Sequence, residues 1–259
     1  MLKSLNTAAT GMDAQQKKMD TIANNLANVN TTGFKKSRTE FEEVYVETLR
    51  RADAPELGGR PAPLETGLGV RTVATTRSFA QGNLVGTENP LDLAIEGDGF
   101  FQVRQPDGTV AYTRAGNFRL DATGRLVTQH GEAIEPEIVV PTDATGITVQ
   151  RDGLVLATVP GRTEPIEVGT LELVLFPNPG GLEGMGRNLF RETPGSGAPL
   201  RTLPGEEGAG GIAQGFLETS NVTAVEEMIE MITTQRAYEM NSKVIQTVDQ
   251  MLQRLANLR

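Results

Sequence analysis

The stretch ANNLANVNTTGFK, residues 23–35, marks the place where a helical sequence pattern ends and a different pattern begins. It carries four asparagines in the seven positions 24–30, although asparagine is a poor helix former that competes for backbone hydrogen bonds. The run Asn30-Thr31-Thr32 before Gly33 is turn and capping chemistry, which predicts that a helix ends here. Leu26 and Val29 continue the apolar side of that helix up to the turn.

Three of the asparagines, Asn24, Asn25 and Asn28, surround the last apolar positions. A polar group on a packed helix surface fixes register and partner at some cost in stability. We interpret these amides as a specificity device near the end of an assembly helix, with Phe34 as the anchor of the chain where it leaves. Fraying of the helix into the turn is the simpler interpretation of residues 30–33.

Upstream of this stretch, the sequence predicts an N-terminal helix from about residue 3 to residue 29. An apolar column recurs at heptad spacing, and a column of small or polar residues follows it four positions later. Gly11 weakens the helix and Gly33 ends it. The apolar column is Leu5, Met12, Met19 and Leu26, and the second column is Ala9, Gln16, Ala23 and Asn30.

The C-terminal segment predicts a second helix of about 36 residues, which would be about 50 Å long. Ser220 or Asn221 can cap it, and Glu226 and Glu227 fall in the first turn, where the helix dipole favours negative charge. Each terminal helix needs a partner, either the other helix or copies in neighbouring subunits. Apart from a gap around Arg236, its apolar positions keep three- or four-residue spacing: Val225, Ile229, Ile232, Met240, Val244, Val248, Met251, Leu255 and Leu258.

Between the helices the pattern changes to two-residue alternation. Short runs such as FFQVRQPDGTVAYTR are separated by Asp-Gly and Ala-Thr-Gly turns, which predicts an antiparallel β domain. Residues 51–69 are rich in proline and glycine, so we expect a loop or an extended arm there. Residues 177–186 and 193–211 are expected to be loops for the same reason.

Composition excludes several classes of function. The formal net charge of −9, without a run of lysine or arginine, argues against nucleic-acid binding, which needs a basic surface. The chain has no cysteine and a single histidine, His130, which excludes thiolate chemistry and disfavours a histidine-based metal site. No stretch has the length of a membrane span or of a signal-peptide core, so the chain is expected to be cytoplasmic or exported without a cleaved signal.

Catalysis has one weak candidate. Asp92, Glu96 and Asp98 in PLDLAIEGDGFF could act as an acid/base set on a glycan, but a hairpin turn at Asp98-Gly99, with the other carboxylates on the polar face of a strand, is favoured. His130 precedes a glycine, as turn residues do, and nothing in the sequence pairs a serine with it. We therefore expect no enzyme activity, no cofactor, no metal and no small-molecule substrate.

Three segments resemble the bacterial flagellar axial proteins of the rod and hook. They are MDTIANNLANVNTTGFKKSRTEFEEV near the N-terminus, IEGDGFFQVRQPDGTVAYTRAGNFRLDATGRLVT in the β region, and ETSNVTAVEEMIEMITTQRAYEMNSKVIQTVDQML near the C-terminus. The resemblance runs nearly end to end. The string LPGEEGAGGIAQGFLETSNV and the length of the chain are most similar to subunits of the distal part of the rod.

The resemblance implies a structural subunit of the distal rod that polymerises into a hollow helical drive shaft and transmits torque from motor to hook. Implied partners are copies of itself, proximal rod proteins, the hook protein, the peptidoglycan-associated and outer-membrane flagellar rings, and the flagellar type III export apparatus. The implied location is the basal body, spanning the periplasm after export without signal cleavage. A hook or proximal rod subunit, and an exported β-domain protein that acts on cell-wall glycan, stay open as alternatives.

On this basis the expected fold class is α+β. Long N- and C-terminal helices would pair as a coiled-coil-like inner domain, with a central antiparallel all-β domain and an extended arm. The expected parts are residues 1–32 as the N-terminal assembly helix, 33–80 as a connecting segment with the arm, 81–212 as the β domain, and 213–259 as the C-terminal assembly helix. The resemblance further implies that residues 45–69 hold a segment associated with rod straightness.

Overall fold

The computed structural model describes residues 2–50, 63–162 and 164–257. The chain forms two compact units. The first, called here the helical unit, consists of Met1–Ala27, Ser37–Thr76 and Thr223–Arg259. The second, called here the β unit, consists of Asn28–Lys36 and Arg77–Val222. Segments from near both ends of the sequence therefore belong to the same unit.

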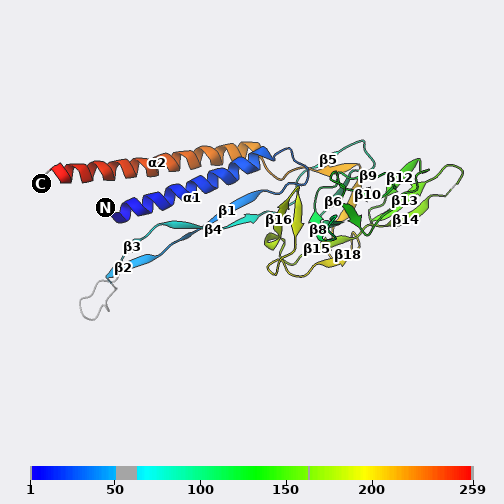
Figure 1. The fold of residues 1–259 in the computed structure, drawn as a ribbon, viewed down its shortest axis with the longest axis horizontal. Helices are drawn as coiled ribbons and strands as arrows, with labels where there is room; N and C mark the ends of the chain where they lie inside the picture. The colour runs from blue at the N-terminus through cyan, green and yellow to red at the C-terminus, as the bar shows by residue number, and fades with distance from the viewer. Residues whose placement is uncertain (1, 51–62, 163, 258–259) are drawn as a thin grey trace. The chain divides into compact units, whose positions relative to one another are not determined.

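The helical unit contains two helices and a ribbon of strands. Helix α1 spans Leu2–Ala27 and helix α2 spans Ala224–Asn257, as the helical spacing of their apolar residues predicts. Figure 1 shows α1 lying between α2 and the ribbon. The two helices and the large β-rich region between them in the sequence confirm the expected α+β class.

The start of α2 differs from the prediction. Thr223 directly precedes the helix, and its carbonyl accepts a hydrogen bond from the Glu227 backbone N–H at 3.1 Å. The expectation that Ser220 or Asn221 caps the helix is therefore wrong. The Asn221 amide instead donates to the carbonyls of Ser78 and Ala80 within the β unit, at 2.9 and 3.0 Å.

The ribbon of the helical unit consists of two strand pairs. β1 (Ser37–Glu43) pairs with β4 (Val70–Arg77), and β2 (Val46–Arg50) pairs antiparallel with β3 (Leu64–Gly67). The expectation of a loop over residues 51–69 is thus wrong for β3, because pairing with β2 satisfies its backbone groups in a way that local composition does not show. The rest of the predicted arm, residues 51–62, lies outside the described residues.

The largest sheet of the β unit has nine strands. Seven follow the order β16, β17, β8, β7, β11, β10 and β9, while β15 pairs with both β7 and β18. These pairs are antiparallel, as the alternating pattern predicted. The strands are β7 (Phe100–Arg104), β8 (Val110–Thr113), β9 (Arg119–Leu120), β10 (Leu126–Val127), β11 (Ala133–Glu135), β15 (Leu173–Leu175), β16 (Glu183–Gly186), β17 (Leu189–Arg191) and β18 (Leu200–Thr202).

The described part of the β unit also contains three smaller sheets. One has the order β12 (Gly146–Val149), β13 (Leu154–Thr158) and β14 (Ile166–Thr170), and the other two pair β19 (Gly211–Gln214) with β6 (Leu93–Glu96) and β20 (Phe216–Glu218) with β5 (Leu84–Gly86). The 3-10 turn η2 spans Pro179–Gly181. The expectation of loops over residues 177–186 and 193–211 is wrong where β16 and β18 form, since both pair with neighbouring strands.

The core of the β unit includes an aromatic cluster on the β7–β8–β15 side. Phe100, Tyr112, Phe176 and Phe190 pack edge to face, with ring centroids 4.8–6.1 Å apart. Burial in this cluster raises the pKa of Tyr112 to about 12. The predicted Asp-Gly turns are confirmed at Gly108, where φ is +83°, between β7 and β8, and likewise between β12 and β13.

Candidate assembly surfaces

Small and polar side chains form the contact between α1 and α2. A Cβ added to Gly11 would lie 2.9 Å from the amide nitrogen of Asn241, so this glycine permits a close approach of the helices. Lys18 Nζ lies 3.3 Å from a carboxylate oxygen of Glu230 across the same contact. Thr234 on α2 is buried with 2% exposure. The helices therefore meet through polar groups as well as apolar ones.

The predicted apolar column of α1, made of Leu5, Met12, Met19 and Leu26, is half-buried in the single chain. The buried apolar residues of this helix are Ala8, Ala14 and Ile22, and two of them lie three positions after a member of the column. The predicted second column, four positions after the first, is exposed at Ala9, Gln16, Ala23 and Asn30. Within the single chain this second column is therefore not covered, and its role in contacts with other copies stays a prediction.

The predicted apolar positions of α2 lie mostly on its uncovered side. Val248 is buried, and six others are between 45% and 70% exposed: Val225, Ile229, Ile232, Met240, Val244 and Met251. The side chain of Leu255 and all of Leu258 lie outside the described residues. Met228, 51% exposed, adds to the same side near the start of the helix. We name the exposed residues Val225, Met228, Ile229 and Ile232 the outer face of α2.

The asparagines of the stretch that ends α1 have different surroundings. Asn25, 1% exposed, pairs with the backbone of Ser37, accepting from its N–H and donating to its carbonyl, both at 2.9 Å. Its amide also donates to the buried carboxylate of Glu227 on α2 at 3.1 Å. Asn24 is exposed, and Asn28 accepts from the Thr31 hydroxyl at 3.1 Å. Asn25 thus links α1, β1 and α2 inside one chain.

A buried ion network lies in the β unit, at the segment that follows α1 in the sequence. Lys35 is fully buried and its ammonium donates to a Glu218 carboxylate oxygen at 2.7 Å, and Arg114, 3% exposed, donates to the other oxygen at 2.9 Å. Burial lowers the pKa of Lys35, and the negative charge of Glu218 acts in the opposite direction. Phe34, the predicted anchor, and Val29 are only half-buried.

Sequence reasoning missed this network, whose Lys35 is fully buried while Phe34 is only half-buried. Its members are 104 and 183 residues apart along the chain, so no local pattern joins them. The one local signal was a lysine directly after the Asn-Thr-Thr-Gly-Phe run. A charged residue is seldom buried without a partner, which identifies such a position only once the fold is known.

The candidate catalytic carboxylates serve structural contacts. Asp92 accepts from the Thr87 hydroxyl at 2.7 Å, and Glu96 pairs with Arg151 at 2.8 Å. The predicted Asp98-Gly99 hairpin turn is wrong, because β6 and β7 pair with other strands and Asp98 forms a bridge with Ala209. Within the described part of the chain, no group of three or more histidine, aspartate or glutamate side chains could hold a metal ion. Neither helix, as far as it is described, is long and apolar enough to cross a membrane.

Known family models match three parts of the chain. They are described as "Flagella basal body rod protein" for residues 5–35, "Flagellar hook protein FlgE/F/G D1 domain" for residues 94–157, and "Flagellar basal body rod FlgEFG protein C-terminal" for residues 213–258. The flagellar basal-body rod protein FlgG of Buchnera aphidicola from Schizaphis graminum is 50% identical, and the alignment covers all of both chains. The chain belongs to the flagellar basal-body rod protein family.

Other relatives separate the rod from the hook. Rod proteins FlgG of Borreliella burgdorferi and Bacillus subtilis are 49% and 42% identical, and each alignment covers 100% of this chain and at least 99% of the relative. The hook protein FlgE of Helicobacter mustelae is 44% identical over 138 residues, which is 52% of this chain and 30% of that protein. This rod protein is accordingly a structural subunit of the flagellar distal rod.

Proposed function

We propose that this rod subunit polymerises through the outer face of α2 and the half-buried column of α1 into a hollow helical drive shaft that transmits torque from motor to hook. The observation that carries the proposal is the orientation of α2, whose exposed side carries the apolar outer face while its side toward α1 buries Glu227 and Thr234. Exposed contiguous apolar surface on a soluble chain marks an interaction site. Repeated heterologous contacts between copies then generate an open helix rather than a closed dimer.

The size of the apolar surface suits a repeated contact. Full burial of an exposed aliphatic side chain contributes roughly 1.5–3 kcal/mol. The four residues of the outer face of α2 are 50–70% exposed, so covering them would contribute about 3–7 kcal/mol per copy before ordering costs. The helices of neighbouring copies would pair in a coiled-coil-like inner tube, with the β unit as the outer layer. Residues 45–69 would bridge adjacent subunits and contribute to rod straightness.

The assembled shaft would contact proximal rod proteins, the hook protein, and the peptidoglycan-associated and outer-membrane rings. Subunits would pass through the flagellar type III export apparatus without signal cleavage and act in the periplasm as structural rather than catalytic components. Mapping the protein relative to the rings distinguishes this position from that of a hook or proximal rod subunit. A location distal to the outer-membrane ring would contradict the distal-rod assignment.

Charge substitutions on α2 test the assembly surface. Ile229→Asp and Ile232→Asp place an unpaired carboxylate on the outer face, which costs several kcal/mol if it becomes buried. Gln150→Asp introduces the same charge at an exposed turn position of the β unit, which is not part of that face, and serves as the matched control. We expect the first two variants to raise the concentration needed for filament formation at least about tenfold, with unchanged circular dichroism. Equal effects of all three substitutions, or normal filaments from the first two, would contradict the proposal.

A further inference from the structure

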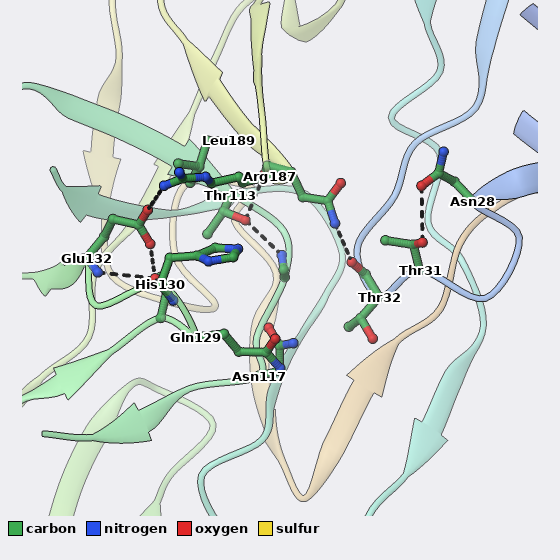
Figure 2. A pocket seen from close by; sticks show the side chains of 13 residues that line it. Asn28, Thr31, Thr32, Thr113, Asn117, Gln129, His130, Glu132, Arg187 and Leu189 are labelled. Carbon is green, nitrogen blue, oxygen red and sulfur yellow. Dashed lines mark hydrogen bonds and ion pairs between the residues drawn. The ribbon is translucent and has the colours of Figure 1, made fainter. Parts of the chain in front are cut away.

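The β unit contains a polar cavity of about 430 Å³ that the contacts of a rod shaft do not explain. Its wall is built from four separate segments: the turn of residues 28–32, residues 113–117 after β8, the turn of residues 128–132, and residues 187–189 at the β16–β17 turn. Figure 2 shows His130, Gln129 and Asn117 on the side of the cavity opposite Asn28, Thr31 and Thr32. The volume falls within the range of about 300–1,000 Å³ that is usual for small-molecule sites.

Hydrogen bonds between the segments hold the wall in place. The Asn188 amide donates to the Thr32 carbonyl at 3.0 Å, and the Thr113 hydroxyl donates to the Asn188 carbonyl at 2.9 Å. Arg187 and Asn188 both adopt the left-handed backbone conformation, with φ of +54° and +59°. Two consecutive non-glycine residues in this conformation form a tight hairpin turn, which aims their side chains at the neighbouring segments. The cavity is therefore formed before any ligand arrives.

The charged groups of the wall neutralise one another. Glu132 is 3% exposed, lies 3.7 Å from the Arg187 guanidinium and accepts a bond from the Thr128 hydroxyl. A buried carboxylate paired with an arginine leaves no net charge to attract an ion. The wall thus favours a neutral ligand over a phosphate or a carboxylate.

Three polar side chains in the wall are available to a ligand. Within the described part of the chain, the side chains of Asn117, Gln129 and His130 make no hydrogen bond or ion pair. Each amide offers both donors and an acceptor, and a neutral imidazole offers one of each. Such groups match hydroxyls, which donate and accept at the same time. Leu189 also lines the cavity but is only 4% exposed, so recognition of a ligand rests mainly on the polar groups of the wall.

We propose that this cavity binds a neutral saccharide of one or two rings. Asn117 and Gln129 hydrogen-bond its hydroxyl or acetamido groups, and the His130 ring packs beside it. A ligand of this size without aromatic stacking binds with a dissociation constant on the order of 1 mM. Contact with the turn of residues 28–32, directly after α1, would couple ligand binding to the segment where the chain enters the β unit.

Nuclear magnetic resonance of the full chain tests the proposal, because His130 is the only histidine and gives a unique imidazole signal. The protein, kept below the concentration at which it polymerises, is titrated with N,N′-diacetylchitobiose, with maltose and, separately, with inorganic phosphate. We expect saturable shifts of the His130 signal with at least one saccharide and none with phosphate. Saturation by phosphate alone would identify an anion site and overturn the proposal, as would the absence of any saccharide-induced shift.

Variants then assign the contact. Gln129→Ala, at an exposed position that leaves the fold intact, and Asn117→Ala should each weaken saccharide binding about threefold to tenfold. Gln150→Ala removes an exposed glutamine of a turn outside the cavity and should leave the affinity unchanged. Unchanged affinity in the Gln129→Ala protein would overturn the assignment. A His130 shift that appears on concentrating the protein without saccharide, and that saccharide does not compete away, would show that a second copy fills the cavity and would also overturn it.

Discussion

Replacing Glu218 by glutamine tests whether the buried ion network holds the β unit together. One oxygen of this carboxylate accepts from Lys35 Nζ at 2.7 Å and from the Gly82 backbone N–H at 2.8 Å, and the other accepts from Arg114 Nε at 2.9 Å. Glu218 is 1% exposed. The Glu218→Gln protein keeps the shape of the side chain but leaves two buried cations without an anion between them.

The expected loss of stability is large. Breaking a buried ion pair by removing one partner costs about 3–5 kcal/mol, because the remaining charge is desolvated and unpaired. At about 2–4 °C per kcal/mol for a unit of this size, the melting temperature of the β unit should fall by about 10 °C. The matched control is Glu183→Gln, whose carboxylate pairs with Arg191 at 2.6 Å on the surface. Surface pairs contribute about 0–1 kcal/mol, so this control should melt close to the wild type.

Differential scanning calorimetry at several pH values measures both the loss and its cause. Burial lowers the pKa of Lys35 below its ordinary value of 10.5, and removing Glu218 lowers it further. Between the folded pKa and 10.5 the unfolded chain binds more protons at this lysine than the folded chain, so raising the pH through that window stabilises the folded state. The deficit of the Glu218→Gln protein should therefore shrink from neutral toward alkaline pH. A deficit no larger than that of the Glu183→Gln protein, or one that grows with pH, would refute the reasoning.

Three further predictions concern glycine, amide and phenol groups. In thermal unfolding, Gly33→Ala should lower the free energy of unfolding by about 3 kcal/mol or more, and Gly108→Ala by about 1 kcal/mol. Both glycines have positive φ, but only a Cβ at Gly33 would meet backbone, at 2.6 Å. Equal losses in the two variants would contradict this reasoning. Asn25→Ala removes three hydrogen bonds and should destabilise the helical unit by about 2–4 kcal/mol in urea unfolding. Asn6→Ala, at an exposed position, should cost less than about 0.5 kcal/mol. Similar values for the two variants would show that the Asn25 bonds matter little. In the wild type, burial of the neutral Tyr112 phenol contributes stability below pH 10, and this contribution should be lost between pH 10 and 12 as the pH rises. Tyr112→Phe should abolish the tyrosinate absorbance step near pH 12. Persistence of that step in the variant would contradict its assignment to Tyr112.

The elements that the sequence revealed are those with local causes. Helical spacing predicted α1 and α2, and Asp-Gly pairs predicted turns, because both depend on residues close together in the chain. Strand β3 was missed because residues 64–67 follow a proline-rich run, and what makes them a strand is their pairing with β2. The network of Lys35, Arg114 and Glu218 was missed for the same reason on a larger scale, since residues far apart in the chain meet only in the fold.

The sequence also located the apolar positions of α2 without showing which side would be covered. Periodicity identifies an apolar side, and the usual inference is that the nearest helix covers it. Here α1 takes the opposite side, and Ile229 and Ile232 stay 57% and 50% exposed. The reason lies in single polar residues, whose partners a hydrophobicity pattern does not record.

These polar residues fix the rotation of α2. Glu227 is fully buried and receives the Asn25 amide, which is itself tied to the backbone of Ser37 on β1. Turning α2 about its axis to bring Ile229 and Ile232 against α1 would separate Glu227 from Asn25, and each buried polar group left unpaired costs about 1–3 kcal/mol, more when it is charged. The gain from covering two aliphatic side chains, about 1.5–3 kcal/mol each, is of similar size, so the rotation brings no net advantage. The amide near the end of α1 therefore helps to keep the apolar side of α2 turned outward within the single chain, as the proposed contact between copies requires.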